Sequence, residues 1–335
     1  MKTVAVVILN WNGKKLLHEF LPNIIRFSNP EFCTIYVIDN NSDDDSILFL
    51  QKKFPTVKIV INKTNFGFAE GYNVGLQSID ADFFALVNSD IEVTENWLEP
   101  IMKTFRKEEN IAIIQPKILD YKDKSVFEYA GAGGGFLDNF GYPYCRGRIF
   151  NSIEKDQEQY NDEAEIFWAS GACLVIRKSV YTELKGFDAD FFAHQEEIDL
   201  CWRAKNLGYQ VFYNGKSTVY HVGGATLKEN NPKKTFLNFR NNLLMLIKNL
   251  PNNRLFVIVA LRLFLDGVAG VKFLFEKKPL HTIAIIKAHF SMYAVLLKTL
   301  KKRKQTPKKI VNYYQTNIII KQYFINKKQT FNQLS

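Results

Sequence analysis

The sequence predicts an α/β fold, with a mostly parallel central sheet flanked by helices. Through the first half of the chain, short apolar runs alternate with longer stretches of mixed polarity, which is the pattern of strands connected by covering helices. Hydrophobic residues make up 47% of the 335 residues, which is enough for a full core in one large domain or two closely joined ones.

The elements are expected in regular alternation along the chain. Five apolar runs are expected strands: residues 3–9, 34–39, 57–61, 83–87 and 111–115. Four intervening stretches have helical length and mixed polarity: residues 14–27, 46–54, 69–78 and 95–107. Residues 121–160 are rich in loops and glycine and are expected to border the site. A strand over 166–176 and a helix over 196–207 are expected after them.

The N-terminus and the cysteines both favour a cytoplasmic protein. The apolar run after Lys2 is too short for an export signal, and Asn10 follows it instead of a small-residue cleavage site. The four cysteines are widely spaced and form no CxxC pair, so neither a zinc site nor a disulfide framework is indicated. A reducing compartment is the simpler assumption.

A basic helical C-terminal region, residues 226–335, is expected after a first domain over residues 1–225. From residue 251 onward, 16 Lys or Arg face only two acids, a balance of +14 that leaves −4 for the first 250 residues. No apolar run approaches the roughly 20 residues that span a bilayer. The region either lies on an anionic membrane surface, with the basic cluster at 301–309 facing lipid headgroups, or packs as a helical subdomain with a solvated charged face.

Polar residues stand at the carboxyl ends of three expected strands, which is where open α/β sheets bind ligands. Asn10 and Asn12 follow the first strand, Asp39 ends the second, and Asn88 and Asp90 follow the fourth. Asp39 suits a ribose hydroxyl or a base N–H, but an Asp at a strand end serves equally well as an N-cap or turn residue.

Asp90 and His221 are candidate metal ligands. Asp90 lies in the string LVNSDIEV, directly after an apolar strand. A carboxylate presented this way suits a hard Mg²⁺ or Mn²⁺ ion that bridges two phosphates, although one acid alone equally caps the helix expected near Thr94. His221 ends a later apolar strand. A lone histidine is more often packed and hydrogen-bonded than a ligand, so its role depends on its neighbours.

The string NFGFAEGYNVG spaces Gly67, Gly71 and Gly75 by four residues around a helix start. One face of that helix is therefore bare enough for close backbone approach, either by a ligand or by the sheet beneath it. The GxGxxG pattern of a dinucleotide fold does not follow the first strand, which disfavours a nicotinamide enzyme.

The string GFDADFFAHQEEIDLCWRAKNLGY is the densest acidic and aromatic segment of the chain. Glu196 and Glu197 are adjacent, so on a helix they point about 100° apart and serve different neighbours. Asp199 and Arg203 stand at i and i+4 and are expected first as a structural ion pair. The two glutamates are then left for chemistry.

Taken together, these strings resemble the inverting family 2 glycosyltransferases of the GT-A fold, especially the rhamnosyltransferase-like branch that builds bacterial surface polysaccharides. The resemblance covers about residues 3–225. It is carried by VVILNWNG, Asp39, NFGFAEGYNVG, LVNSDIEV, WASGACLVIRKSVY, FFAHQEEIDLCWR and His221. Each string alone is unspecific, but their order and spacing together argue against chance agreement.

The resemblance implies a metal-dependent enzyme that moves a sugar from a nucleotide-diphosphate donor to a hydroxyl of a glycan or polyprenyl-linked glycan, at the inner face of the cell membrane. Rhamnose is one candidate sugar. The implied donor-binding residues are Asn10, Asn12, Asp39, Asn65, Gly67, Gly71, Asn73, Asn88, Ser89, Trp168, Ser170 and Gly171. Asp90, as the surviving acid of the family's DxD motif, and His221 are implied to hold Mg²⁺ or Mn²⁺. Glu197 is the implied catalytic base, Glu196 is implied to orient the acceptor, and Asp199 is the reserve candidate for the base.

Two positions depart from the family pattern. Asn88 stands where many members have the first DxD aspartate, and Glu197 replaces an aspartate. Glutamate is one methylene longer, yet a carboxylate in a partly desolvated cleft still accepts an acceptor proton. The implied mechanism is a single displacement, in which the configuration of the sugar inverts because no covalent intermediate forms.

Three other functions stay open. A non-catalytic nucleotide-sugar-binding scaffold would explain both departures as lost chemistry. A nucleotidyltransferase needs a glycine-rich basic loop after the first strand, and NWNGKK is a poor version of one. A nucleic-acid-binding protein would use the basic tail, but a basic segment rich in Leu, Ile and Phe fits an anionic membrane better, so no nucleic-acid partner is expected.

Overall fold

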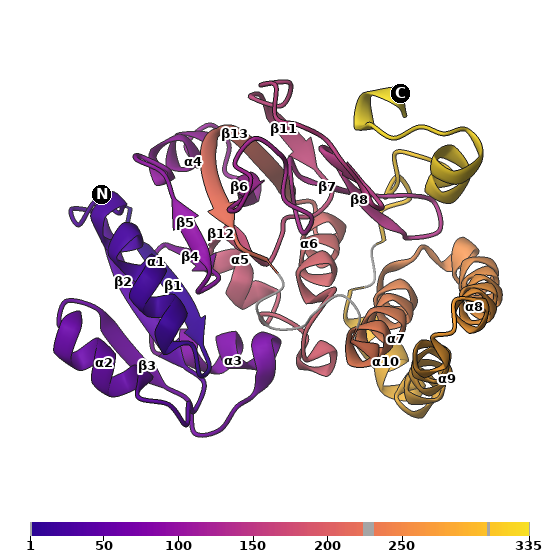
Figure 1. The fold of residues 1–335 in the computed structure, drawn as a ribbon, viewed down its shortest axis with the longest axis horizontal. Helices are drawn as coiled ribbons and strands as arrows, with labels where there is room; N and C mark the ends of the chain where they lie inside the picture. The colour runs from indigo at the N-terminus through magenta and orange to yellow at the C-terminus, as the bar shows by residue number, and fades with distance from the viewer. Residues whose placement is uncertain (1, 224–230, 307–308, 335) are drawn as a thin grey trace.

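The computed structural model describes residues 2–223, 231–306 and 309–334 and confirms the predicted α/β class (Figure 1). Within these residues a nine-stranded sheet runs in the order β11-β13-β6-β12-β4-β1-β2-β3, with β5 paired to β13. The strands are β1 (Val4–Asn10), β2 (Cys33–Asp39), β3 (Lys58–Ile61), β4 (Phe83–Val87), β5 (Ile91–Val93), β6 (Ile111–Asp120), β11 (Glu163–Ile166), β12 (Cys173–Arg177) and β13 (Gln210–His221). The half formed by β3, β2, β1 and β4 is parallel throughout.

Helices cover both faces of this sheet. They are α1 (Lys14–Phe27), α2 (Ser46–Lys53), α3 (Gly67–Leu76), α4 (Leu98–Phe105), α5 (Lys178–Glu183) and α6 (Glu196–Asn206). In β1, Val4, Val6 and Ile8 join a core with α1 and α4, whereas Ala5 and Val7 join a core with α3, α5 and α6. Successive side chains of a strand point to opposite faces, so a strand buried on both faces is apolar along its whole length.

The structure differs from the expected elements in two places. The expected strand over 166–176 is two separate strands, because β11 pairs with β13 whereas β12 pairs with β4 and β6. Residues 167–172 cross between them. The loop-rich segment also holds a second, four-stranded sheet, made of β7 (Gly135–Leu137), β8 (Pro143–Cys145), β9 (Arg148–Ile149) and β10 (Ser152–Ile153).

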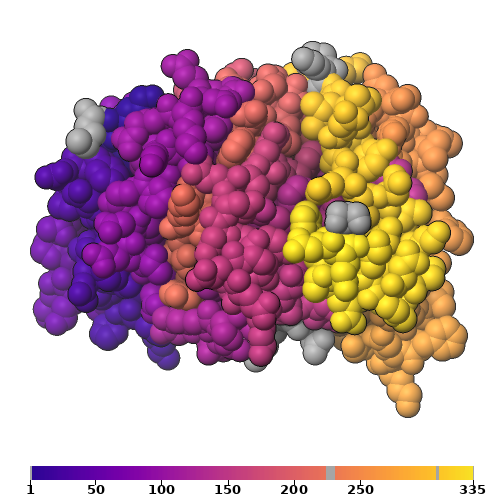
Figure 2. All heavy atoms as spheres, turned by 90° about the horizontal axis from the view of Figure 1, so that it is seen from above, coloured from indigo at the N-terminus to yellow at the C-terminus, as the bar shows by residue number. Residues whose placement is uncertain are grey.

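The described residues of the C-terminal region form four α-helices at one end of the molecule (Figure 1): α7 (Pro232–Asn249), α8 (Asn252–Phe275), α9 (Pro279–Ala294) and α10 (Leu296–Gln305). Leu243, Leu244 and Leu246 of α7 belong to the same core as Trp202 of α6. The last segment, 309–334, drawn in yellow, borders the magenta part of the chain (Figure 2). Ile319 of this segment packs on Tyr144 and Ile149 of the small sheet. The described helices therefore continue the core of the preceding residues.

The basic cluster at 301–309 is only partly available to lipid, which corrects one expectation. Lys302 forms ion pairs with Asp188 and Asp190. Arg303 is buried and donates hydrogen bonds to the carbonyl groups of Ile247 and Leu250. Lys308 lies outside the described residues. No single helix among the described residues is long and apolar enough to cross a membrane, and only the pair α9 and α10, bent by 61°, qualifies by length and composition.

Candidate active site

The carboxyl ends of β1 and β2 lie side by side, because Asn10 pairs in register with Asp39. The buried carboxylate of Asp39 accepts hydrogen bonds from the Asn10 amide at 3.0 Å and from the Ser42 hydroxyl at 2.7 Å. The Asn10 side-chain oxygen is buried without a partner among the described residues. A buried acceptor without a donor is costly, so this oxygen suits a ligand N–H or O–H.

The other polar residues at this edge shape the loops around it. The Asn12 side-chain oxygen accepts hydrogen bonds from the backbone N–H groups of Asp43 and Asp44. The Asn65 oxygen accepts from Asn40 at 2.9 Å and from the Gly67 N–H. The side chains of Asn12 and Asn65 therefore order the loops that surround Asp39.

The glycines of NFGFAEGYNVG are required by close approach. At Gly67, where φ is +75°, a Cβ would lie 2.6 Å from the Phe192 ring. At Gly71 it would lie 3.0 Å from the Asn40 amide, and at Gly75 it would lie 2.5 Å from Ile38 of β2. The absence of a side chain at Gly75 lets α3 pack closely on the sheet. At Gly67 it lets the start of α3 approach the loop before α6.

Asn73, expected to bind donor, is occupied by packing interactions. Its amide donates to the Glu70 carboxylate and the Phe187 carbonyl, both at 2.8 Å. Its oxygen accepts from the Tyr181 hydroxyl and the Phe187 N–H. Because these contacts use the donors and the acceptor of the amide, we correct this prediction and assign Asn73 to the support of the loop before α6.

Asp90 and His221 lie together, as expected of a shared site. His221 Nε2 is 3.2 Å from Asp90 Oδ1, and His221 Nδ1 is 3.3 Å from Glu128 Oε1. Burial alone would lower the pKa of His221, but hydrogen bonds and charge from Asp90 and Glu128 outweigh it and raise this pKa to about 10. Asn88 and Ser89 are half-buried beside them, and their side chains make no hydrogen bond to a described residue.

This pocket suits a divalent cation that is completed by a ligand. No group of three or more His, Cys, Asp or Glu in metal-binding geometry occurs in the part of the chain that the structure describes. Mg²⁺ and related ions usually take one or two carboxylates from the protein and the rest of their oxygen ligands from phosphates and water. Two buried carboxylates outweigh the single charge of a protonated His221 and form an anionic pocket. A cation would neutralise this pocket, and His221 would give up a ring proton to ligate it, so Asp90 and His221 fit this role.

Ser170 and Gly171 connect the metal candidates to the glutamate pair. β4 pairs with β12, and the Asn88 N–H donates to the carbonyl of Ala172, so the residues before β12 lie beside those after β4. A Cβ at Gly171 would lie 3.8 Å from the Cβ of Glu197. Trp168 is buried, and its indole N–H donates to the carbonyl of Phe136, so it supports the small sheet.

Glu196 and Glu197 open α6, and each has one buried carboxylate oxygen without a partner among the described residues. Oε2 of each is shielded from solvent and has no hydrogen bond among the described residues. Burial, followed by the charge of Glu197, raises the pKa of Glu196 well above its usual range. Burial raises the pKa of Glu197 to about 7, against the opposing effect of N–H groups at the start of α6. A carboxylate that titrates near neutral pH is suited to act as a general base.

Asp199 has a structural role, so its place as reserve base is corrected. The predicted ion pair is present, with Arg203 Nε 2.8 Å from Asp199 Oδ2. Lys248 Nζ lies 2.8 Å from the same oxygen, and the Asn249 amide donates to Oδ1 at 2.8 Å. A fully buried carboxylate with all these donors is held ionised and away from a substrate.

Helix α7 holds the loop that presents the glutamates, a feature that the sequence alone did not indicate. The Asn241 amide donates to the carbonyl groups of Phe191, Ala193 and His194, at 2.8 to 2.9 Å. This loop is strained, with φ values of +63° at Phe192 and +73° at Gln195. The sequence also did not indicate Glu128. Its approach to His221 depends on packing between segments that are distant in the sequence.

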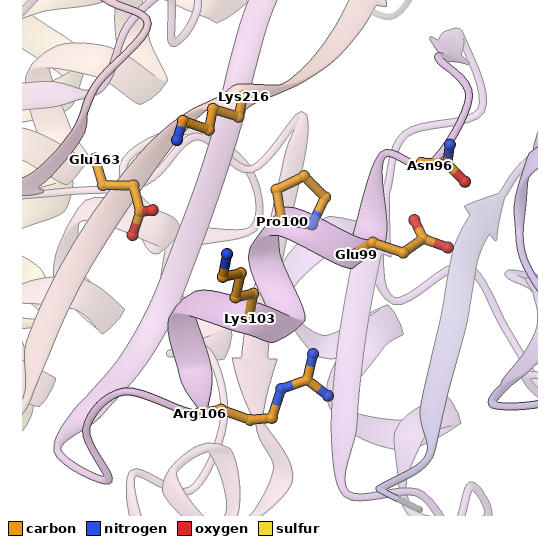
Figure 3. Close-up of a pocket in the computed structure, with 7 residues that line it drawn as sticks. All are labelled: Asn96, Glu99, Pro100, Lys103, Arg106, Glu163 and Lys216. Atoms are coloured by element: carbon orange, nitrogen blue, oxygen red, sulfur yellow. The ribbon is translucent and has the colours of Figure 1, made fainter.

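A hollow of about 500 Å³ elsewhere on the surface does not belong to this site. It lies between α4, β11 and β13, and none of the predicted residues lines it (Figure 3). Lys103, Arg106 and Lys216 line it together with Glu99 and Glu163. The mixture of charges gives no single class of ligand.

Comparison with known proteins identifies the class to which this fold and site belong. Residues 5–184 match the model of "Glycosyl transferase family 2", so the chain belongs to that family. Among curated proteins it is 22% identical over 234 residues to an N-acetylglucosaminyl-diphospho-decaprenol L-rhamnosyltransferase of Mycobacterium tuberculosis, covering 65% of this chain and 75% of the relative. It is also 22% identical over 219 residues to the rhamnosyltransferase WbbL of Escherichia coli, covering 63% and 80%. Its curated relatives thus include rhamnosyltransferases.

Solved structures agree on the GT-A fold. GalNAc-T7 with UDP, GalNAc and Mn²⁺ superposes with a TM-score of 0.66 at 14% identity, covering 98% of this chain and 57% of that one. The mannosyltransferase PcManGT of Pyrobaculum calidifontis, in complex with GDP-Man and Mn²⁺, gives a TM-score of 0.52 at 13% identity, covering 91% and 85%. At this identity the likeness establishes the fold.

Proposed function

We propose that this chain is a metal-dependent, inverting glycosyltransferase that uses a nucleotide-diphosphate sugar. One observation carries the proposal. Glu197, which with Glu196 has a carboxylate oxygen without a partner, lies beside Gly171. Gly171 precedes β12, which pairs with the end of β4, and Asn88, Ser89 and Asp90 follow β4. This arrangement supports an acceptor base and a diphosphate site at one edge of the sheet.

The donor would extend along this edge. The base and ribose would contact Asp39 and the free oxygen of Asn10, which β1 and β2 hold together. The diphosphate would lie near Asn88 and Asp90, on the neighbouring strand β4. The order of the strands supports this placement, because the switch point of the parallel half falls between β1 and β4.

Asp90 and His221 would hold Mg²⁺ or Mn²⁺, which supplies positive charge for the leaving diphosphate when bound. Neighbours of similar fold were crystallised with Mn²⁺. The fold holds His221 Nε2 at 3.2 Å from Asp90 Oδ1. Such preorganisation is the main way a protein lowers the barrier of a charge-developing reaction.

Glu197 would accept the proton of the acceptor hydroxyl. The oxygen so released attacks the anomeric carbon, the bond from that carbon to the diphosphate oxygen breaks, and the configuration inverts. Glu196 is more deeply buried than Glu197 and holds a proton more tightly. It would therefore orient the acceptor as a hydrogen-bond donor while Glu197 exchanges the proton.

The acceptor would be a glycan, and a polyprenyl-linked glycan is the form we favour, with rhamnose as one donor sugar. The relatives named as rhamnosyltransferases support this choice, one of them acting on a decaprenol-linked sugar by its name. Such an acceptor places the reaction at the cytoplasmic face of the cell membrane, in cell-surface polysaccharide biosynthesis.

Thermal stabilisation of the purified protein by UDP, dTDP, GDP and NAD, each with and without Mn²⁺, tests the proposal. We expect one nucleoside diphosphate to raise the melting temperature in a Mn²⁺-dependent way, and NAD to have no effect. The same nucleotide should be released from the matching sugar donor when acceptor is added. Stabilisation without turnover would identify a nucleotide-sugar-binding scaffold instead, and no stabilisation by any diphosphate would refute the proposal.

A further inference from the structure

Helix α8 exposes a stripe of apolar side chains and buries two charged ones, which departs from the pattern of an ordinary surface helix. Its buried residues are Ile258, Arg262, Asp266 and Gly270. Arg262 donates to the carbonyl of Phe140 and stacks on the Tyr142 ring at 3.8 Å. Asp266 lies 3.2 Å from His289 of α9. Arg262 and Asp266, two of the charged residues that interrupt this apolar segment, therefore make their contacts inside the protein.

The outer face of α8 is a continuous apolar stripe. Val257, Leu261, Phe264, Val268, Val271 and Phe275 are all exposed and follow one another at spacings of three and four residues. At 1.5 Å per residue the stripe is about 27 Å long. Phe275 is 84% exposed and Phe264 is 68% exposed, which is unusual for phenylalanine in a protein that meets only water.

Helix α9 adds a second exposed stripe at the same end of the molecule. Ile283, Ile286, Phe290 and Tyr293 follow the same spacing, and Phe290 is 71% exposed. The helices contact each other, since Thr282 donates to the carbonyl of Gly270 and His281 stacks on Phe273. Both lie at the far end from the N-terminal helices (Figure 1). We call the exposed apolar residues of α8 and α9 the apolar face.

We propose that the apolar face is a docking surface for an anionic lipid bilayer, on which α8 and α9 lie in the interface without crossing it. Between residues 252 and 304 the exposed charged side chains are seven lysines and Glu276. Apolar side chains surrounded by lysines are the composition of interfacial helices that bind anionic lipid. A second copy of this chain would bring the two sets of lysines together, so charge favours the bilayer as the occupant.

The helices behind the apolar face connect it to the active site. The Thr235 hydroxyl lies 2.7 Å from Nδ1 of His281, which joins α7 to α9. Further along α7, Asn241 holds the carbonyl groups of the loop before Glu196. Docking would thus fix the height of the glutamate pair above the bilayer. This consequence rests on the proposed function with a lipid-linked acceptor, whereas the docking itself rests on the apolar face.

Co-sedimentation of the full-length protein with vesicles tests the docking. Vesicles of phosphatidylcholine mixed with phosphatidylglycerol are compared with vesicles of phosphatidylcholine alone. The double variant Phe264→Ser/Phe290→Ser should lose about tenfold or more of its partition onto the mixed vesicles, because two buried rings are removed from the bound state. The control Leu48→Ser/Ile153→Ser removes exposed apolar residues outside α8 and α9 and should bind within about twofold of the wild type.

Three results would overturn the proposal. They are equal binding of the Phe264→Ser/Phe290→Ser variant, equal binding of the wild type to both kinds of vesicle, and a wild-type dimer that the variant converts to monomer without any vesicle binding. The last result would assign the apolar face to self-association. Nucleotide stabilisation measured on the same variant separates this proposal from the proposed function. If the wild type binds vesicles but no nucleotide, only the proposed function is refuted. If it binds nucleotide but no vesicles, only the docking is refuted.

Discussion

Replacing Glu197 with Gln keeps the size of the side chain and removes the charge that we assign to the base. Burial raises the pKa of Glu197 from its ordinary value of 4.5 to about 7. Between these two values the folded protein binds more protons than the unfolded chain, so this carboxyl makes the free energy of unfolding fall as the pH rises through that window. Each pKa unit corresponds to about 1.4 kcal/mol. The free-energy cost of ionising the Glu197 carboxyl in the folded protein therefore reaches about 3 kcal/mol above pH 7.

The Glu197→Gln variant should therefore be more stable than the wild type at pH 8, by up to about 3 kcal/mol. Part of this gain in stability is offset. The Gln amide brings an N–H donor to the position of an oxygen that has no partner, and a buried donor without an acceptor is costly. At pH 4.5 and below, the two proteins should differ little, since both side chains are neutral. Urea denaturation at the two pH values measures this difference, and Glu31→Gln, at an exposed carboxylate, is the matched control.

The same variant should lose about 10²- to 10⁴-fold in kcat, the usual contribution of a general base, while its stabilisation by nucleoside diphosphate stays near that of the wild type. In the wild type, kcat should fall below about pH 7, where Glu197 becomes protonated. A variant that is less active but also less stable at pH 8 would indicate a structural role instead. Full turnover in Glu197→Gln would refute the assignment of the base.

Three further variants test the supports of the site. Asp90→Asn should abolish the Mn²⁺-dependent part of nucleotide stabilisation. It also breaks the buried contact with His221, so we expect a lower melting temperature of the free protein, and a Mn²⁺ effect preserved in the variant would contradict the metal assignment. Asn241→Leu removes the side-chain donor of three loop carbonyl groups, of which that of Phe191 still accepts from the Ala193 N–H. We therefore expect about 2 kcal/mol of destabilisation together with a lower kcat, both measured beside wild type. Gly67→Ala meets the Phe192 ring at 2.6 Å and should lower activity more than Gly208→Ala, which has the same sign of φ but open space around it.

Local patterns were sufficient to predict the parallel half of the sheet and the polar residues at its edge. The strand at Phe83–Val87 was predicted with its observed bounds, because a strand buried on both faces is apolar at every position. The meeting of Asn10 and Asp39 follows from parallel pairing alone. The expected strand over 166–176 failed because the residues between β11 and β12 are also apolar and buried. Periodicity does not distinguish a crossing segment from a continuous strand.

Contacts between distant segments were not predictable in this way. Nothing near Glu128 in the sequence indicates that it would approach His221, which is 93 positions away. Asn241 reads as an ordinary polar residue of a helix, and its importance comes from the carbonyl groups that the fold places opposite it. Arg262 and Asp266 read as interruptions of an apolar stretch, whereas the structure turns them inward and leaves the apolar residues outside.

Asp188, which lies before α6, pairs with two lysines of the basic C-terminal region. These pairs cross the predicted boundary between residues 225 and 226. Burial would raise the pKa of Asp188, but Lys248 and Lys302 outweigh it and hold this pKa well below its usual range. Both lysines lie beyond the boundary. A chain that ends at residue 225 would lose these partners of Asp188 and Asp199 and would uncover the core that Leu243, Leu244 and Leu246 share with Trp202. We therefore expect the first 225 residues to be unstable alone, which would make the two regions one folding unit.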